Sequence, residues 1–250
     1  MYLLAWELIV IQVKDYEAKY EKYKEKEMKI EEFFKKVNVQ IPEHLKDNYD
    51  HNKDIESVTQ NGWAIQYIEN PSEEIKKIAV AQNGFAIMYI KNPSEEIQKL
   101  AVEQYANAIY YIANPSEEIK KIAVKQDGLV IQGIKNPSEE IKKLAVKQNG
   151  YAIQYIKDPS EEIQKVAVKQ NGFAIRYIQN PSEEIKKLAV TQNGLVIECI
   201  ENPSEELKKL AVIQNGNAIR HIDNPSEEVM ELAVKQNKEV VQYFEREWFE

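Results

Sequence analysis

The chain has 250 residues, enough for one or two ordinary domains or for one elongated repeat domain. It is 43% hydrophobic and 30% charged, so it can bury a core and stay in solution, while a formal net charge of −8 argues against a general nucleic-acid binder, which usually carries a basic surface. Cys199 is the only cysteine, which excludes an intramolecular disulfide and a cysteine-based zinc or iron–sulfur site and fits a reducing, cytoplasmic location.

Residues 1–53 differ from the rest of the chain. The start, MYLLAWELIVIQV, lacks a basic region and is interrupted by Glu7, so it predicts no signal peptide, and it is too short to span a membrane. ELIVIQV is rich in β-branched residues and predicts a strand, and KDYEAKYEKYKEKEMKIEEFF predicts a charged amphipathic helix. No other segment looks like a β partner, so three alternatives stay open. The strand pairs with a second copy in a homo-oligomer formed through residues 1–37, adds to a partner's sheet, or is helical. Of these readings and a cap, we favour a segment that packs on the repeats as an N-terminal cap over self-pairing.

Residues 54–237 repeat with a period of 22. When rows are written from Gly62, seven of the eight glycines open a row and eight of the nine prolines fall in one column. DIESVTQNG, residues 54–62, is a degraded first row. A fixed period in this range is typical of a solenoid, in which each unit contacts only its neighbours.

Each row predicts two short helices. In NPSEEIKKIAVAQN, Asn70 can cap the first helix, Pro71 suits position N1, and Glu73 can reach back as in a capping box. Gly84 can then take the left-handed conformation that ends this helix. GWAIQYIEN, residues 62–70, predicts a second helix of about two turns, α or partly 3₁₀.

These helices need neighbours, because isolated helices below about 12–15 residues are marginal in water. Stacked rows would bury the constant apolar columns, which contain Ile65, Ile68, Ile75, Ala79 and Val80. The sequence therefore predicts a mainly α fold: a right-handed α-solenoid of eight 22-residue helix–turn–helix repeats at 54–237, a small N-terminal strand-plus-helix cap at 1–53, and a C-terminal capping helix at 238–250.

The repeat letters carry a resemblance. AVKQNGYAIQYI, residues 145–156, fits the pattern AVxQNGxAIxYI and resembles the helical repeat of a domain of unknown function, DUF4116. The half DP/NP-S-E-E-I-K-K-L-A-V also resembles leucine-rich-repeat-variant and HEAT-like repeats. The resemblance covers about residues 54–241 and implies a binding platform without catalytic activity. Because related repeats occur in bacteria, bacteriophages and large viruses, it also implies a phage-type inhibitor of a host defence enzyme such as a nuclease.

The constant polar columns predict structural roles. The Glu73 and Lys77 columns are spaced i, i+4 with glutamate first, which favours helix formation on a solvated face. The Gln82 column is glutamine in every row and predicts a hydrogen bond to the loop backbone of the next row; the alternative is a ladder that binds a ligand.

The variable positions cluster on the second helix, one and four residues after each glycine. Positions i and i+3 share a helix face, so both columns should line one surface strip. Aromatic residues mixed with Arg, Met and Gln are typical of protein-binding surfaces; the alternative is that the aromatic column only packs between rows. The candidate partner-binding residues are Trp63, Gln66, Phe85, Met88, Tyr110, Tyr151, Gln154, Phe173, Arg176 and Arg220.

The tyrosine column, five residues after each glycine, departs from tyrosine at Gly133, Cys199 and His221. Where it is Gly or Cys, the usual alanine becomes Val130 or Val196, which indicates local volume compensation. The alternative is a pair of notches that accept something.

No catalytic constellation is evident. The histidines His44, His51 and His221 are far apart, and the first two lie in a polar segment that predicts a plain loop rather than a metal site. Cys199 predicts a packing thiol, and no phosphate-binding glycine motif is present. We therefore expect no enzyme, cofactor, metal or membrane contact, but a protein partner. An oligomeric spacer is the alternative, and nucleic-acid binding by the mildly basic middle rows is a third.

Overall fold

A computed structural model describes residues 43–244, with side chains from residue 51 onward. The predicted strand and charged helix of the N-terminal segment, the oligomer through residues 1–37, and the part of the predicted capping helix at 245–250 lie outside the described residues. Between residues 43 and 244 every regular element is helical, with no strand. No helix of this part of the chain is long and apolar enough to cross a membrane.

The chain divides into two compact units after Gln82. In the described part of the first unit, α3 (Glu43–Gln60), η1 (Gly62–Tyr67) and α4 (Glu73–Gln82) pack on one another. The second unit alternates six-residue 3₁₀-helices with ten-residue α-helices. In chain order they are η2 (Gly84–Tyr89), α5 (Glu95–Gln104), η3 (Ala106–Tyr111), α6 (Glu117–Gln126), η4 (Gly128–Gly133), α7 (Glu139–Gln148), η5 (Gly150–Tyr155), α8 (Glu161–Gln170), η6 (Gly172–Tyr177), α9 (Glu183–Gln192), η7 (Gly194–Cys199), α10 (Glu205–Gln214), η8 (Gly216–His221), α11 (Glu227–Gln236) and η9 (Lys238–Tyr243).

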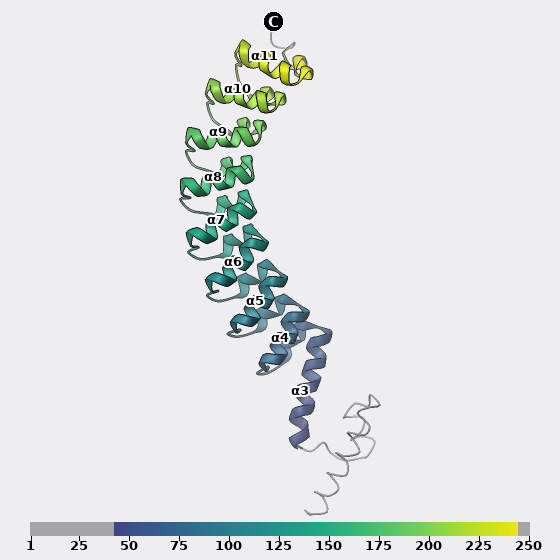
Figure 1. Cartoon of the computed structure of the whole chain (residues 1–250). Coiled ribbons are helices and arrows are strands. Elements are labelled where there is room, and N and C mark those ends of the chain that lie inside the picture. The colour runs from purple at the N-terminus through teal and green to yellow at the C-terminus, as the bar shows by residue number, and fades with distance from the viewer. Residues whose placement is uncertain (1–42, 245–250) are drawn as a thin grey trace, which may run out of the picture. The chain divides into compact units, whose positions relative to one another are not determined.

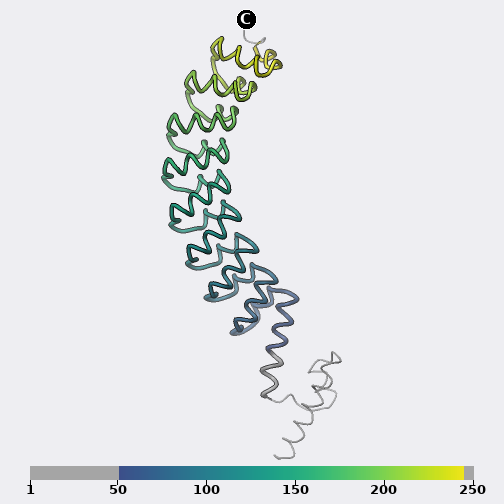
Figure 2. Tube along the Cα trace, viewed as in Figure 1, coloured from purple at the N-terminus to yellow at the C-terminus, as the bar shows by residue number. Residues whose placement is uncertain are grey.

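Within the second unit the layers stack in chain order, each α-helix against the next α-helix and each 3₁₀-helix against the next 3₁₀-helix (Figures 1 and 2). The core is a set of repeated columns: Ile141, Ala145 and Val146 of α7 are 0% exposed, and the equivalent residues of the other α-helices are buried as well, apart from the half-buried Val234 of α11. This confirms repeated short helices that pack consecutively, and it identifies the shorter helix of each row as 3₁₀.

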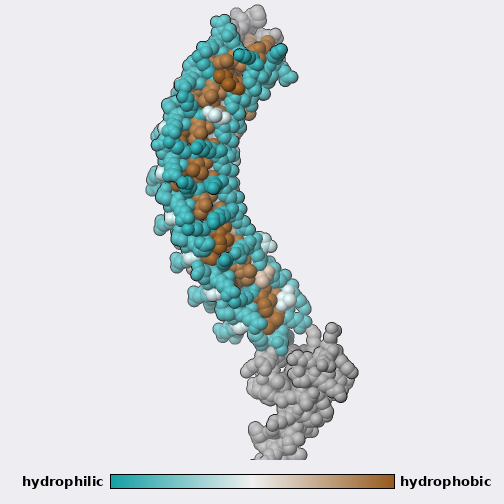
Figure 3. Space-filling model, in the orientation of Figure 1, coloured by the Kyte–Doolittle hydropathy of each residue, from teal (hydrophilic) through white to brown (hydrophobic). Residues whose placement is uncertain are grey.

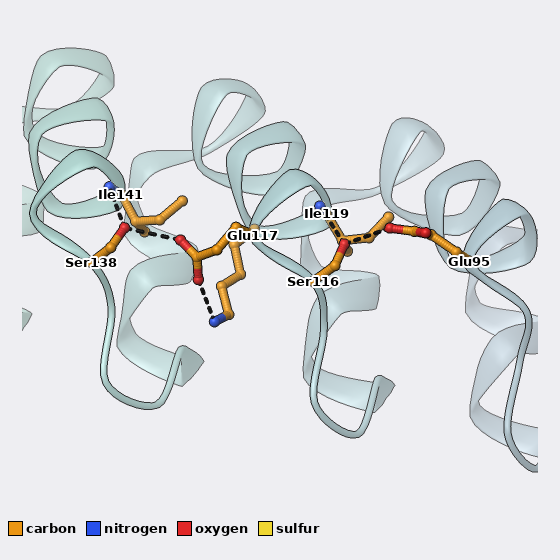
Figure 4. A network of polar contacts seen from close by, with 7 residues as sticks. Glu95, Ser116, Glu117, Ile119, Ser138 and Ile141 are labelled. Carbon is orange, nitrogen blue, oxygen red and sulfur yellow. Dashed lines mark hydrogen bonds and ion pairs between the residues drawn. The ribbon is translucent and has the colours of Figure 1, made fainter.

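Serine, not asparagine, caps the α-helices. Ser138 Oγ accepts a hydrogen bond from the backbone N–H of Ile141 at 3.3 Å and donates one to Glu117 Oε2 of the preceding layer at 2.9 Å (Figure 4). Asn136, two residues earlier, has a φ of 47°, in the left-handed region that asparagine tolerates better than most residues. The prediction of an asparagine cap is wrong because the left-handed asparagine turns the chain before the helix begins.

The row-opening glycines are required by close approach rather than by backbone conformation. No described glycine has a positive φ, so the prediction of a left-handed Gly84 is wrong. A Cβ at Gly128 would lie 2.3 Å from the carbonyl oxygen of Ala145 in the next α-helix, far inside van der Waals contact. Glycine therefore lets the start of η2 and of η4 to η8 approach the backbone of the following α-helix.

The constant glutamines bond to backbone, as predicted, but not to that of the next row. Gln148 Oε1 accepts a hydrogen bond from the N–H of Gly128, which opens the same row, at 2.7 Å. Its Nε2 donates to the carbonyl of Gln126, in the preceding row, at 3.1 Å. Gln148, and Gln170 in the same way, thus ties a 3₁₀-helix to two successive α-helices.

The charged face of the α-helices is neutralised mainly by pairs other than the predicted i, i+4 contacts. Lys120 pairs with Glu117 at i, i+3 with a distance of 2.7 Å, and Lys121 pairs with Glu140 of the next layer at 2.9 Å. The hydrogen bond from Lys120 lowers the pKa of Glu117, and the hydrogen bond to Glu140 raises the pKa of Lys121. The prediction considered one helix at a time, whereas stacking supplies nearer partners.

Both ends of the described chain differ from expectation. Residues 44–51 are helical, as part of α3, so the prediction of a plain loop there is wrong. His51 Nε2 of this helix lies 3.6 Å from Glu74 Oε2. At the other end, residues 238–243 form a 3₁₀-helix like those before it, with Val240 buried and Val241 exposed. This segment begins as a further repeat rather than as a separate amphipathic helix.

Candidate functional site

The variable positions lie on the 3₁₀-helices. We call the side chains one, four and five residues after the start of η2 to η8 the 3₁₀ strip; Trp63 and Gln66 hold equivalent positions on η1 of the first unit. The position after the start is half-buried, as at Phe85, Tyr151 and Phe173, except at Asn107, which is exposed. The fourth position is exposed, as at Met88, Tyr110, Gln154, Arg176 and Arg220.

Several strip aromatics pack between layers. The Phe85 ring stacks on Tyr105 with centroids 4.8 Å apart and meets Tyr111 edge-on at 6.2 Å. Tyr151 meets Tyr177 of the next layer edge-on at 6.0 Å. Such geometries are favourable for aromatic pairs. The half-buried rings therefore hold the exposed tyrosines of the next layer in place, while their own outer edges remain open to solvent.

A second contact links neighbouring layers along the strip and was missed from the sequence. The residue four after one row start meets the residue five after the next, 23 positions later. The ring of Tyr110 lies against Gly133, where an added Cβ would be 2.3 Å from it. Partial burial, with Asp127 as a second cause, raises the pKa of Tyr110.

The same spacing recurs at the other departures from tyrosine. Arg176 Nη2 lies 3.6 Å from Cys199 Sγ, and Glu198 Oε2 lies 3.4 Å from His221 Nδ1. Each substituted position thus has a matched partner in the preceding layer. Val130 and Val196, to which the sequence had assigned the compensation, are buried in the core at 0% exposure. The signal in the sequence was that the fourth position of one row and the fifth position of the next, 23 residues apart, change together.

Arg176 and Arg220 of the strip contact neighbouring side chains. The Arg176 guanidinium lies 5.5 Å from the centre of the Phe173 ring and 3.7 Å from Glu198. The hydrogen bond to Cys199 is the largest cause that raises the pKa of Arg176. Arg220 lies over the Tyr243 ring at 4.9 Å. These contacts already restrict the arginine side chains, so less side-chain entropy would be lost when a partner binds.

The pairing at Gly133 makes a test by double substitution possible. Gly133→Tyr alone should lower the free energy of unfolding by about 1–3 kcal/mol, because two rings would compete for one place. Adding Tyr110→Gln should recover most of the loss, because the double variant has the same pair of residues, glutamine and tyrosine, as Gln132 and Tyr155 one layer further on. Urea denaturation of the four variants would give the coupling, expected at about 1 kcal/mol or more. Additive effects would show that these layers do not share this space.

Comparison with known families identifies one segment. Residues 138–183 match the family model described as "Domain of unknown function (DUF4116)". The DUF4116 match begins at the serine cap of α7 and ends at the first residue of α9, so it spans two consecutive layers of the stack. It agrees with the resemblance seen in the repeat letters. No curated protein and no solved structure matches the chain.

The described side chains offer no evident metal site. Among residues 51–244, no three His, Cys, Asp or Glu side chains are grouped so as to hold a metal ion. What the DUF4116-like layers do present is a row of half-buried apolar and aromatic side chains beside exposed polar ones. Figure 3 shows apolar residues gathered in a row along one face, with hydrophilic residues on both sides.

Proposed function

We propose that the chain is a non-catalytic right-handed α-solenoid that binds a protein partner through the 3₁₀ strip. The observation that carries the proposal is the difference between the two faces: the contacts on the α-helix face are constant from layer to layer, whereas the side chains of the 3₁₀ strip vary. The α-helix face repeats the same Glu–Lys and Ser–Glu contacts from layer to layer. The fourth position of the strip, by contrast, varies along the stack, from Met88 to Tyr110 to Gln132 and, further on, to Arg176 and Glu198. The strip therefore carries a surface that a specific partner can distinguish.

The strongest anchors lie on the first layers of the second unit. Met88 is 42% exposed, Tyr110 and Tyr111 are each 47% exposed, and Tyr105 is 46% exposed. Large aromatic side chains dominate the energetics of protein interfaces. Here the Phe85 ring already orders two of these tyrosines, so less conformational entropy would be lost on binding.

A triple substitution on the strip tests the proposal. Met88→Ala, Tyr110→Ala and Gln154→Ala together should lower the affinity for a partner identified by co-purification and mass spectrometry at least about tenfold. The reason is that a few interface side chains usually carry most of the affinity. The matched control is Glu118→Ala, Lys143→Ala and Glu206→Ala on the exposed α-helix face, which should change the affinity less than twofold. Circular dichroism should show both variants folded. Equal affinity of the strip variant and the parent would contradict the proposal.

A narrower form of the proposal rests on the resemblance to phage and viral repeats: the partner is a host defence enzyme, such as a nuclease, that the strip inhibits. A cytoplasmic location belongs to the same proposal, because such an enzyme acts there and the single Cys199 needs no oxidising compartment.

A further inference from the structure

Lysines without an ion pair bracket the 3₁₀-helices of the middle layers. Lys125, Lys147 and Lys169 are exposed in the last turns of α6, α7 and α8. Lys135 and Lys157 are exposed directly after the C-caps of η4 and η5. We call these five residues the basic ladder. None of them has an ion pair with a described residue, unlike Lys120, Lys121, Lys142, Lys143, Lys165, Lys186, Lys187 and Lys209 of the α-helix face.

The basic ladder is confined to three layers. At the positions equivalent to Lys125, the flanking layers carry Glu103 and Thr191. At those equivalent to Lys135, they carry Ala113 and, further on, Glu201. The same edges of the stack therefore change from basic to neutral or acidic on both sides.

Two carboxylates lie within the basic ladder, and neither neutralises it. Asp127 is the N-cap of η4, where its Oδ1 accepts a hydrogen bond from the backbone N–H of Leu129 at 2.9 Å. Asp158 is exposed, and no ion pair links it to Lys157 beside it. Residues 106–171, which contain the ladder, carry ten lysines and eight acidic residues, a formal net charge of +2 within a chain whose net charge is −8.

We infer that the basic ladder binds an acidic polypeptide segment in an extended conformation. This deepens the proposed function and rests on it, because the segment would lie across the 3₁₀ strip. Packed helices lie about 8–10 Å apart. A chain in the extended polyproline II conformation advances about 3.1 Å per residue and completes a turn in three residues, so every third side chain lies on the same side. A carboxylate at every third residue of the segment therefore falls in register with lysines that recur once per layer.

The surroundings favour polypeptide over nucleic acid. A nucleic-acid strand that ran along the stack beyond the ladder would meet Glu198, Glu201 and Asp223, where its phosphates would be repelled. An acidic polypeptide segment can end within three layers. Between the lysines, Gln132, Gln154 and Tyr155 are exposed and can exchange hydrogen bonds with a peptide backbone.

A charge-reversal experiment on the full chain tests this inference. The probes are a fluorescein-labelled peptide (Glu-Ser-Ser)₄, a peptide of the same composition with its four glutamates adjacent, and a twelve-residue oligothymidylate. The ladder variant is Lys125→Glu, Lys147→Glu and Lys169→Glu. The control is Lys91→Glu, Lys235→Glu and Lys238→Glu, three exposed lysines outside the ladder that change the net charge equally. Fluorescence anisotropy at an ionic strength of about 0.15 M gives the affinities, and circular dichroism verifies the fold.

We expect the spaced peptide to bind the parent protein more tightly than either other probe. The ladder variant should lose at least about tenfold in affinity and the control less than twofold, because surface charges beyond about 8–10 Å are screened. Equal losses in the two variants, tighter binding of the oligothymidylate, or no binding of the spaced peptide would overturn the inference. A natural partner that the strip variant loses and the ladder variant retains would overturn it while leaving the proposed function intact.

Discussion

Replacing Ile141 by alanine should lower the free energy of unfolding by about 2–5 kcal/mol. Ile141 is 0% exposed and lies on α7, which packs on α6 on one side and on α8 on the other. Truncation would remove buried methyl groups and leave a cavity between three layers. Because each layer is ordered only by its neighbours, the layers around Ile141 cannot collapse independently to fill it.

The matched control is Ile213→Ala, at a position that is 55% exposed on α10. This change should stay within about 0.5 kcal/mol, as is usual for surface positions. Urea denaturation followed by far-UV circular dichroism would measure both. A loss at Ile141 as small as that at Ile213 would mean that the isoleucine column does not form the core.

Replacing Gly128 by alanine should lower the free energy of unfolding by about 1–3 kcal/mol, the usual cost of forcing an extra methyl group into a packed site. The new Cβ would lie 2.3 Å from the carbonyl oxygen of Ala145, and the Gly128 N–H would be pulled from its 2.7 Å hydrogen bond to Gln148. Backbone cannot swing away as a side chain can, so α7 would have to shift.

The control for this change is Gly133→Ala, where the three heavy atoms nearest the added Cβ all belong to the exposed ring of Tyr110. A ring can rotate away, so we expect a smaller loss than at Gly128, measured by the same denaturation. The chain contains one natural precedent, since Ala106 stands in the glycine column and is 7% exposed. If Gly128→Ala left the free energy of unfolding unchanged, the layer of Gly128 would be able to accommodate a Cβ as the layer of Ala106 does.

The core was predictable because its residues recur at the same positions in every 22-residue row. Apolar residues that recur at the same place in every row, such as Ile141 and Ala145, must face the same environment in every layer. The only arrangement that buries them all is a stack, because a single two-helix unit has too little core of its own. Locally spaced residues also indicated the short second helix but left open whether it would be α or partly 3₁₀.

The helix start could not be read from local preference alone. Asn136 and Ser138 are both good capping residues and stand two positions apart. The choice depends on how the chain turns back from the 3₁₀-helix, which puts the asparagine in the left-handed region, and on Glu117 of the preceding layer, which receives the serine hydroxyl. Both constraints arise between layers.

The candidate surface was predictable in place but not in detail. Row comparison located the variable columns on the second helix. It did not show that Tyr110 covers Gly133 or that Arg176 reaches Cys199, because these partners are 23 residues apart in sequence and meet only when the layers stack.

By itself the sequence determined the 22-residue period, the two helices of each row and the columns that form the core, because these follow from periodic burial within a row. Only the tertiary structure decided which residue caps each helix, why glycine opens each row, which charges are paired and which lysines remain without an ion pair. Those features depend on distances between neighbouring layers, and such distances exist only once the layers are packed.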